Sequence, residues 1–100
     1  MNLQEVIDKD YEPLIPIFKK NQKDVIVAME DALSVCNYNE IKFLTHRLRG
    51  TANNYGFMQL GKLGSDLDDL TDLEEKEKMY QLLNEMKIYL EKVQITYVEI

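Results

Sequence analysis

The chain has 100 residues, 45% of them hydrophobic, and carries a formal net charge of −6 at pH 7. This length fits one domain with a small core. The acidic balance disfavours binding to nucleic acid or to an anionic membrane, since both need a basic face, so a protein partner is expected. Four glycines and two prolines leave few turns, which favours a helical protein.

The cysteine content and the amino terminus indicate which covalent bonds, metal sites and cellular compartment to expect. The single cysteine, Cys36, allows no internal disulfide bond; it falls on an apolar helical stripe and is expected to be buried and unreactive. One cysteine and one histidine predict no metal site. The amino terminus lacks the features of a signal peptide, and no apolar run is long enough to span a membrane, so we expect a cytoplasmic protein.

The first third of the chain predicts a long helical segment. Residues 1–10 are polar and predict a short helix or a loose arm. Pro13 and Pro16 suit the first turn of a helix, where missing amide donors cost least. We predict one helix over about 13–36, or two consecutive helices with a break near Asn21. Its apolar positions are Leu14, Ile17, Phe18, Val25, Ile26, Met29, Ala32, Leu33 and Cys36.

A second helix is predicted from Asn37, which is expected to cap it together with Glu40, to about Tyr55. At about 100° per residue its apolar positions cluster on one side; they are Ile41, Leu44, Leu48, Ala52 and Tyr55. The residues that gather on the other side are Lys42, His46, Arg49, Gly50 and Asn53. Packing therefore does not explain the only histidine of the chain.

The rest of the chain predicts two more helices. Gly56 is expected to end the second helix in a left-handed conformation. The third helix carries the stripe Phe57, Leu60, Leu63, Leu67 and Leu70, and its Gly61 and Gly64 are expected to allow close approach of a neighbouring helix. A capping box over 71–74 begins the last helix. Its stripe is Met79, Leu82, Leu83, Met86, Tyr89, Leu90, Val93 and Tyr97. Short connections then predict an all-α, up-down antiparallel bundle.

A motif surrounds the histidine. Residues 46–56 read His-Arg-Leu-Arg-Gly-Thr-Ala-Asn-Asn-Tyr-Gly, which resembles the signature of the histidine-containing phosphotransfer (HPt) domain family, His-x-Leu-Lys-Gly followed by small residues and a further glycine. The resemblance covers roughly residues 10–95 of a single domain, 1–100, and implies a four-helix bundle. Two departures stand out: Arg49 replaces the lysine of the family, and Asp68 lies where well-known members often carry glutamine.

The resemblance implies a phosphorelay intermediate of two-component signalling, a phosphocarrier rather than an enzyme. His46 would accept a phosphoryl group from an aspartate of a receiver domain and pass it to another receiver. Arg49 would stabilise the phosphate, and Gly50 would leave room for the partner. The implied partners are a response-regulator receiver domain and a hybrid histidine kinase. The receiver would supply Mg²⁺, so this chain is expected to bind no cofactor of its own.

Four further residues are candidates for binding. Lys42, one turn before His46, either contacts the phosphoryl group or belongs to a solvated helix face. Phe43 belongs either to an exposed patch that docks the receiver or to a contact with an edge helix. Asp68 would orient the imidazole, repel a phosphoryl group or face solvent. Asn53 is the fourth candidate, because the helical pattern places it on the same face as His46.

A second hypothesis belongs to another functional class. A degenerate HPt domain would act as a helical adaptor that binds signalling partners without being phosphorylated. The retention of His46, Arg49 and Gly50 together favours phosphotransfer, because an adaptor need not keep all three. We expect a monomer, although a domain cut from a larger kinase would leave the same sequence.

Overall fold

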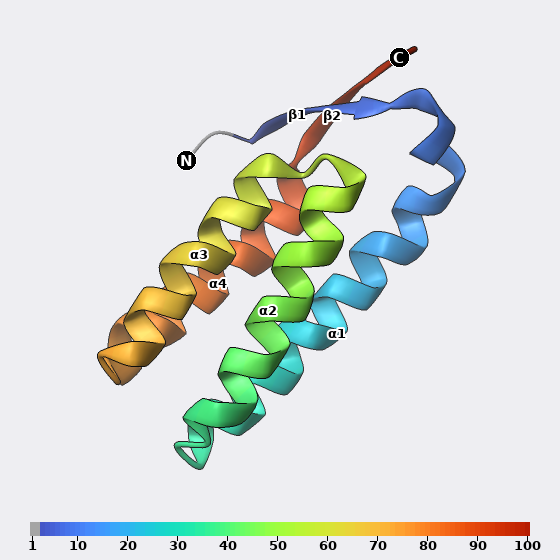
Figure 1. Cartoon of the computed structure of the whole chain (residues 1–100). Helices are drawn as coiled ribbons and strands as arrows, with labels where there is room; N and C mark the ends of the chain where they lie inside the picture. The colour runs from blue at the N-terminus through green and yellow to red at the C-terminus, as the bar shows by residue number, and fades with distance from the viewer. Residues whose placement is uncertain (1–2) are drawn as a thin grey trace.

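The structure is a computed structural model that describes residues 3–100. Four helices form an elongated bundle with extents of 42 × 22 × 19 Å (Figure 1). They are α1 (Ile15–Ser34), α2 (Tyr38–Tyr55), α3 (Met58–Asp72) and α4 (Lys76–Lys92). Each helix packs on the next, and α4 closes the bundle against α1. The predicted all-α four-helix bundle is confirmed.

One apolar core runs through the bundle, and the stripes read from the sequence supply most of it. Its fully buried side chains include Phe18, Ile26, Met29, Leu33, Ile41, Leu48, Leu60, Leu67, Met79, Leu83, Met86 and Tyr89. The helix α1 continues past Asn21 without a break. At its start the predicted stripe is wrong, because Leu14 and Ile17 are exposed while Ile15 is buried. The 3₁₀ helix η1 (Lys9–Leu14) precedes α1 and changes the phase of the pattern.

The turn after α1 corrects the prediction for Cys36. The helix ends at Ser34, and Cys36 adopts a left-handed conformation with φ 54°. Its thiol is exposed, with the ammonium of Lys76 3.5 Å away, rather than buried on the stripe. The carbonyl of Ala32 accepts from the amide of Asn37 at 2.8 Å and so closes the helix end.

The predicted cap residues Asn37 and Gly56 of α2 are confirmed, but within residues 3–100 the side chain of Glu40 does not complete a capping box, because the amide of Asn37 donates to the carbonyl of Ala32. The amide of Glu40 donates to Asn37 Oδ1 at 3.2 Å, and Gly56 ends α2 with φ 93°. The predicted capping box over 71–74 is wrong, because the buried hydroxyl of Thr71 donates to the carbonyl of Leu67 within α3. The chain then turns through a left-handed residue, and α4 begins at Lys76.

Two short strands cover the end of the bundle where α2 passes into α3 (Figure 1). The strands β1 (Gln4–Asp8) and β2 (Gln94–Val98) pair in parallel register, with Gln4 opposite Gln94. The predictions of a helix or loose arm at the amino terminus and of a helical stripe reaching Tyr97 are therefore wrong; residues 1 and 2 of that arm lie outside the described residues. The β-branched and aromatic residues of β2 favour a strand once a partner is present.

The strand β1 is fastened to the bundle by Glu5. Its buried carboxylate accepts a hydrogen bond from the amide of Gln59 at 2.8 Å and another from the hydroxyl of Tyr89. Gln59 lies in the first turn of α3, whose cap residue Phe57 offers no side-chain hydrogen bond. Glu5 thus caps α3 and places a negative charge at its positive end. Burial and, secondly, this hydrogen bond with Glu5 raise the pKa of Tyr89.

Replacing Glu5 by alanine is expected to lower the free energy of unfolding by about 1–3 kcal/mol, because the buried Tyr89 hydroxyl and the Gln59 amide lose their acceptor. Urea unfolding monitored by circular dichroism measures the change. The matched control is Glu99→Ala, at an exposed carboxylate near the other terminus. Equal stability of the Glu5 and Glu99 variants would contradict the capping role.

Candidate functional site

His46 lies in the middle of α2, on the exposed face of that helix. The buried face opposite carries Ile41, Leu44, Leu48 and Ala52, as the sequence predicts. Within residues 3–100 the imidazole forms no hydrogen bond or ion pair. Both ring nitrogens are therefore available to a partner.

The helices α2 and α3 approach closely at two glycines of α3. A Cβ atom on Gly64 would lie 2.6 Å from Cγ of Arg49, and one on Gly61 would overlap Oδ1 of Asn53. The bare backbone of α3 therefore provides the space that these two side chains of α2 occupy. The predicted close approach of a neighbouring helix at Gly61 and Gly64 is confirmed.

Arg49 combines a held stem with an unpaired charge. The side chain is half-buried, and its stem lies against Gly64. Within the described part of the chain its guanidinium has no carboxylate partner. Arg49 follows His46 by three positions and so shares its face of the helix. A cation beside the imidazole is thus free to bind an anion.

Lys42, on the other side of His46, is paired. Its ammonium lies 3.2 Å from Oδ1 of Asp68 and also binds Oδ1 of Asp72, both on α3. The hydrogen bond with Asp72 is the main cause of a raised pKa of Lys42, and Asp68 adds to it. Asp68 therefore contacts Lys42, a role that the sequence did not indicate. Asp72 was not predicted as a residue of the site. It lies four positions after Asp68 on the same face of α3, and this spacing is the signal that could have indicated a pair of carboxylates.

Gly50 lies on the same face, one turn after His46. Apart from the adjacent residues and the neighbouring backbone of α2 itself, a Cβ atom placed there would meet nothing of residues 3–100 within 4 Å. Glycine inside a helix costs roughly 1 kcal/mol relative to alanine, and no contact within the described residues requires it here. The helix surface beside the imidazole is consequently bare and open.

Phe43 adds an apolar group to this surface. Its side chain is 56% exposed, so of the two alternatives the structure supports the exposed patch rather than a contact with an edge helix. The guanidinium carbon of Arg47 lies 5.6 Å from the centroid of its ring, a cation–π arrangement. The surface near His46 therefore offers an aromatic ring as well as charge.

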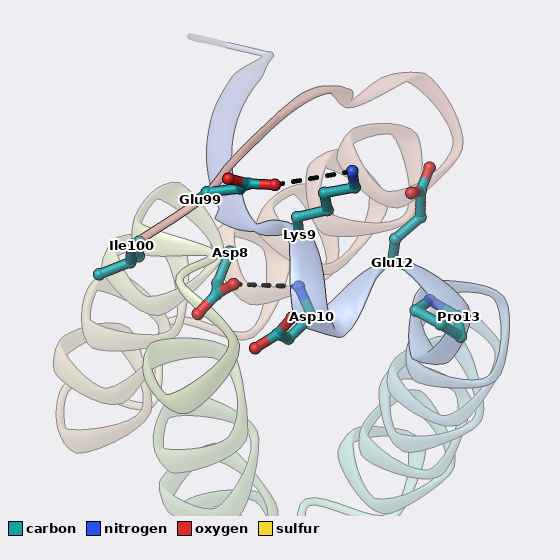
Figure 2. Close-up of a pocket in the computed structure, with 7 residues that line it drawn as sticks. All are labelled: Asp8, Lys9, Asp10, Glu12, Pro13, Glu99 and Ile100. Carbon is teal, nitrogen blue, oxygen red and sulfur yellow. Dashed lines mark hydrogen bonds and ion pairs between the residues drawn. The ribbon is translucent and has the colours of Figure 1, made fainter.

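A hollow of about 650 Å³ lies elsewhere, at the strand end of the bundle (Figure 2). Its lining residues are Asp8, Lys9, Asp10, Glu12, Pro13, Glu99 and Ile100, none of which belongs to α2 or α3. Internal contacts occupy part of it: Asp8 accepts from the amide of Asp10, and Lys9 pairs with Glu99 at 3.9 Å. The hollow and His46 are thus separate features.

Within residues 3–100, no group of three or more His, Cys, Asp or Glu side chains is arranged to hold a metal ion. No helix in the same range is long and apolar enough to cross a membrane.

Comparison with known proteins gave one match. Residues 13–96 match the family model described as the Hpt domain, a stretch that includes all of α1 to α4. Neither the curated proteins nor the solved structures gave a match.

The glycines of this site are expected to respond differently to alanine. Gly50→Ala should raise the free energy of unfolding by about 1 kcal/mol, because the added methyl group meets nothing and alanine favours the helix. Gly64→Ala should lower it by about 1–3 kcal/mol, because the methyl group collides with the stem of Arg49. Urea unfolding measures both changes, and a shift of equal size and sign in the two variants would refute the close packing of α2 on α3.

Proposed function

The chain belongs to the Hpt domain family, and from this premise we propose that His46 is the phosphoacceptor of a phosphorelay. The family acts in histidine phosphotransfer in two-component signalling, and its members are phosphocarriers rather than true enzymes. One observation carries the proposal for this chain: within residues 3–100, an exposed histidine without a partner lies beside the unpaired cation of Arg49 and the open space over Gly50.

In the proposed step, one ring nitrogen of His46 attacks the phosphorus atom of a phosphorylated receiver aspartate. A P–N bond forms while the P–O bond breaks, and its electron pair leaves with the aspartate carboxylate. The phosphorylated ring then releases its extra proton to water. Because the transition state is loose and its charge spreads over the phosphoryl oxygens, positioned cations supply most of the stabilisation. The receiver would supply Mg²⁺.

Arg49 is proposed as the main cation of the step. Its planar guanidinium can donate two parallel hydrogen bonds to a phosphoryl group, which suits an anion at a defined place. The stem against Gly64 limits the positions that the guanidinium can take. Asn53, two turns after His46 on the same face, is proposed to add an amide donor at the edge of the site.

The proposed partners are supported by the family and by the surface around His46. The family interacts generally with receiver domains and histidine kinases, and we propose that a receiver docks over the bare helix at Gly50 with Phe43 as an apolar contact. An exposed aromatic ring is a frequent element of such interfaces. In this proposal the protein works as a monomer in the cytoplasm, beside a hybrid histidine kinase and its receivers.

Replacing His46 by glutamine is expected to abolish phosphorylation. Radiolabelled phosphorylated receivers, with Mg²⁺, would be mixed with wild type and with His46→Gln, and the label would be tested for the lability in acid and stability in base of a phosphohistidine. Label on the wild type alone supports the proposal. A folded wild type that takes no label from a panel of receivers, yet binds them, would establish the adaptor hypothesis instead.

Gly50→Leu is expected to slow transfer by at least about tenfold while leaving folding intact. The larger side chain has free space in the isolated protein, but it would occupy the surface that the receiver must approach. Initial rates of label transfer and urea unfolding measure the two effects. The control is Gln81→Leu at an exposed position of α4, and a Gly50 variant as fast as this control would rule out docking at Gly50.

A further inference from the structure

Lys42, Asp68 and Asp72 form a charged cluster one turn from His46. We infer that Lys42 is a movable cation: it binds the two carboxylates while His46 is bare and turns to the phosphoryl group once His46 carries one. Asp68 and Asp72 are then positioning residues, which set how readily Lys42 is released. The inference rests on the proposed phosphorylation of His46 and adds a control on the stability of the phosphorylated form.

The geometry of α2 allows this exchange. Residues four positions apart on a helix have Cβ atoms about 5–6 Å apart, so Lys42 and His46 are direct neighbours. The ammonium of lysine sits on a flexible stem of four carbons and can therefore swing between α3 and the imidazole. The side chains of Lys42, Asp68 and Asp72 are 39%, 30% and 59% exposed, so the surrounding atoms leave room for the movement.

Lys42 and Arg49 differ in a way that divides their roles. The stem of Arg49 lies against Gly64, and its guanidinium has no carboxylate partner within residues 3–100, so it is a cation held in place for the anion. Lys42 is neutralised by two carboxylates on α3, so it becomes available only when something competes for it. Along α2, His46 lies between these two cations, four positions after Lys42 and three positions before Arg49.

A phosphoryl group on His46 would compete with the two carboxylates for the ammonium of Lys42. With His46 bare, one ammonium and two carboxylates leave the cluster with one excess negative charge. A phosphoryl group brings a further charge of about −1.5 to −2. That group attracts Lys42 more strongly than a single carboxylate does, and it is repelled by Asp68 and Asp72 unless Lys42 comes between them. The cluster thus raises the free energy of the phosphorylated form, which keeps the phosphoryl group transferable.

The test is the equilibrium constant for phosphoryl exchange with one receiver, measured by ³¹P NMR at low protein concentration with Mg²⁺. Substitutions that alter docking change the rates of exchange, but this constant depends only on the free energies of the separated proteins. Asp68→Asn/Asp72→Asn is expected to shift it toward the phosphorylated form of this chain by about threefold or more, and Lys42→Gln away from that form by a similar factor. Lys42→Arg, which keeps the charge, should restore the wild-type constant.

A triple variant separates a movable lysine from a static one. If Lys42 only neutralises the carboxylates, then adding Lys42→Gln to Asp68→Asn/Asp72→Asn changes nothing, because no carboxylate remains to neutralise. If Lys42 binds the phosphoryl group, the equilibrium constant for phosphorylation of this chain is about threefold lower in the triple variant than in the double variant. Lys87→Gln is the matched control, since Lys87 pairs with Glu30 at 2.6 Å on α4 and α1, away from α2 and α3.

The outcomes are distinct. Equal constants for the triple and double variants, or for the double variant and wild type, overturn the inference alone. A wild type that accepts no phosphoryl group overturns the proposed function and the inference together. Urea unfolding of each variant tests whether a shift of the equilibrium constant comes from loss of structure.

Discussion

The close contact of α2 with α3 is the constraint on which the arrangement of the site depends. It exists because Gly61 and Gly64 present bare backbone at the places where Asn53 and Arg49 of α2 cross. A side chain at either glycine would push the helices apart or displace a polar residue of the site. The same contact brings Asp68 and Asp72 within reach of Lys42. Helix packing and the electrostatics around His46 therefore have one origin.

The interactions that fasten the two terminal strands lie away from the proposed site. The strand pair β1 and β2 is bound to the bundle through Glu5, which accepts hydrogen bonds from Gln59 and Tyr89. The proposed site lies on the exposed middle of α2, where His46 and Gly50 make few contacts of their own. A surface that gains nothing from internal packing can be kept free for a partner, because the core and the strand end supply the stability.

Several local patterns in the sequence predicted the structure correctly where the deciding interaction lies within a few residues. The cap at Asn37, the left-handed Gly56 and the two faces of α2 all follow from contacts inside one helix. Predictions failed where a distant segment decides. The residues around Tyr97 continue a helical stripe in isolation, yet they form a strand because β1, about ninety positions earlier, offers a hydrogen-bonding edge. Two predictions failed for local reasons: Cys36 is exposed because α1 ends two residues before the apolar stripe does, and the capping box over 71–74 is absent because the hydroxyl of Thr71 donates to the carbonyl of Leu67.

The sequence by itself determined the helical class, the apolar core stripes, and an exposed histidine followed by a cation and a glycine, because helical periodicity places each residue on a known face. Only the tertiary structure decided which charges are free. Arg49 and Lys42 look alike as basic residues beside His46, but α3 presents a glycine to one and two carboxylates to the other. The pairing of a surface charge depends on the neighbouring helix, and the spacing along one helix carries no record of it.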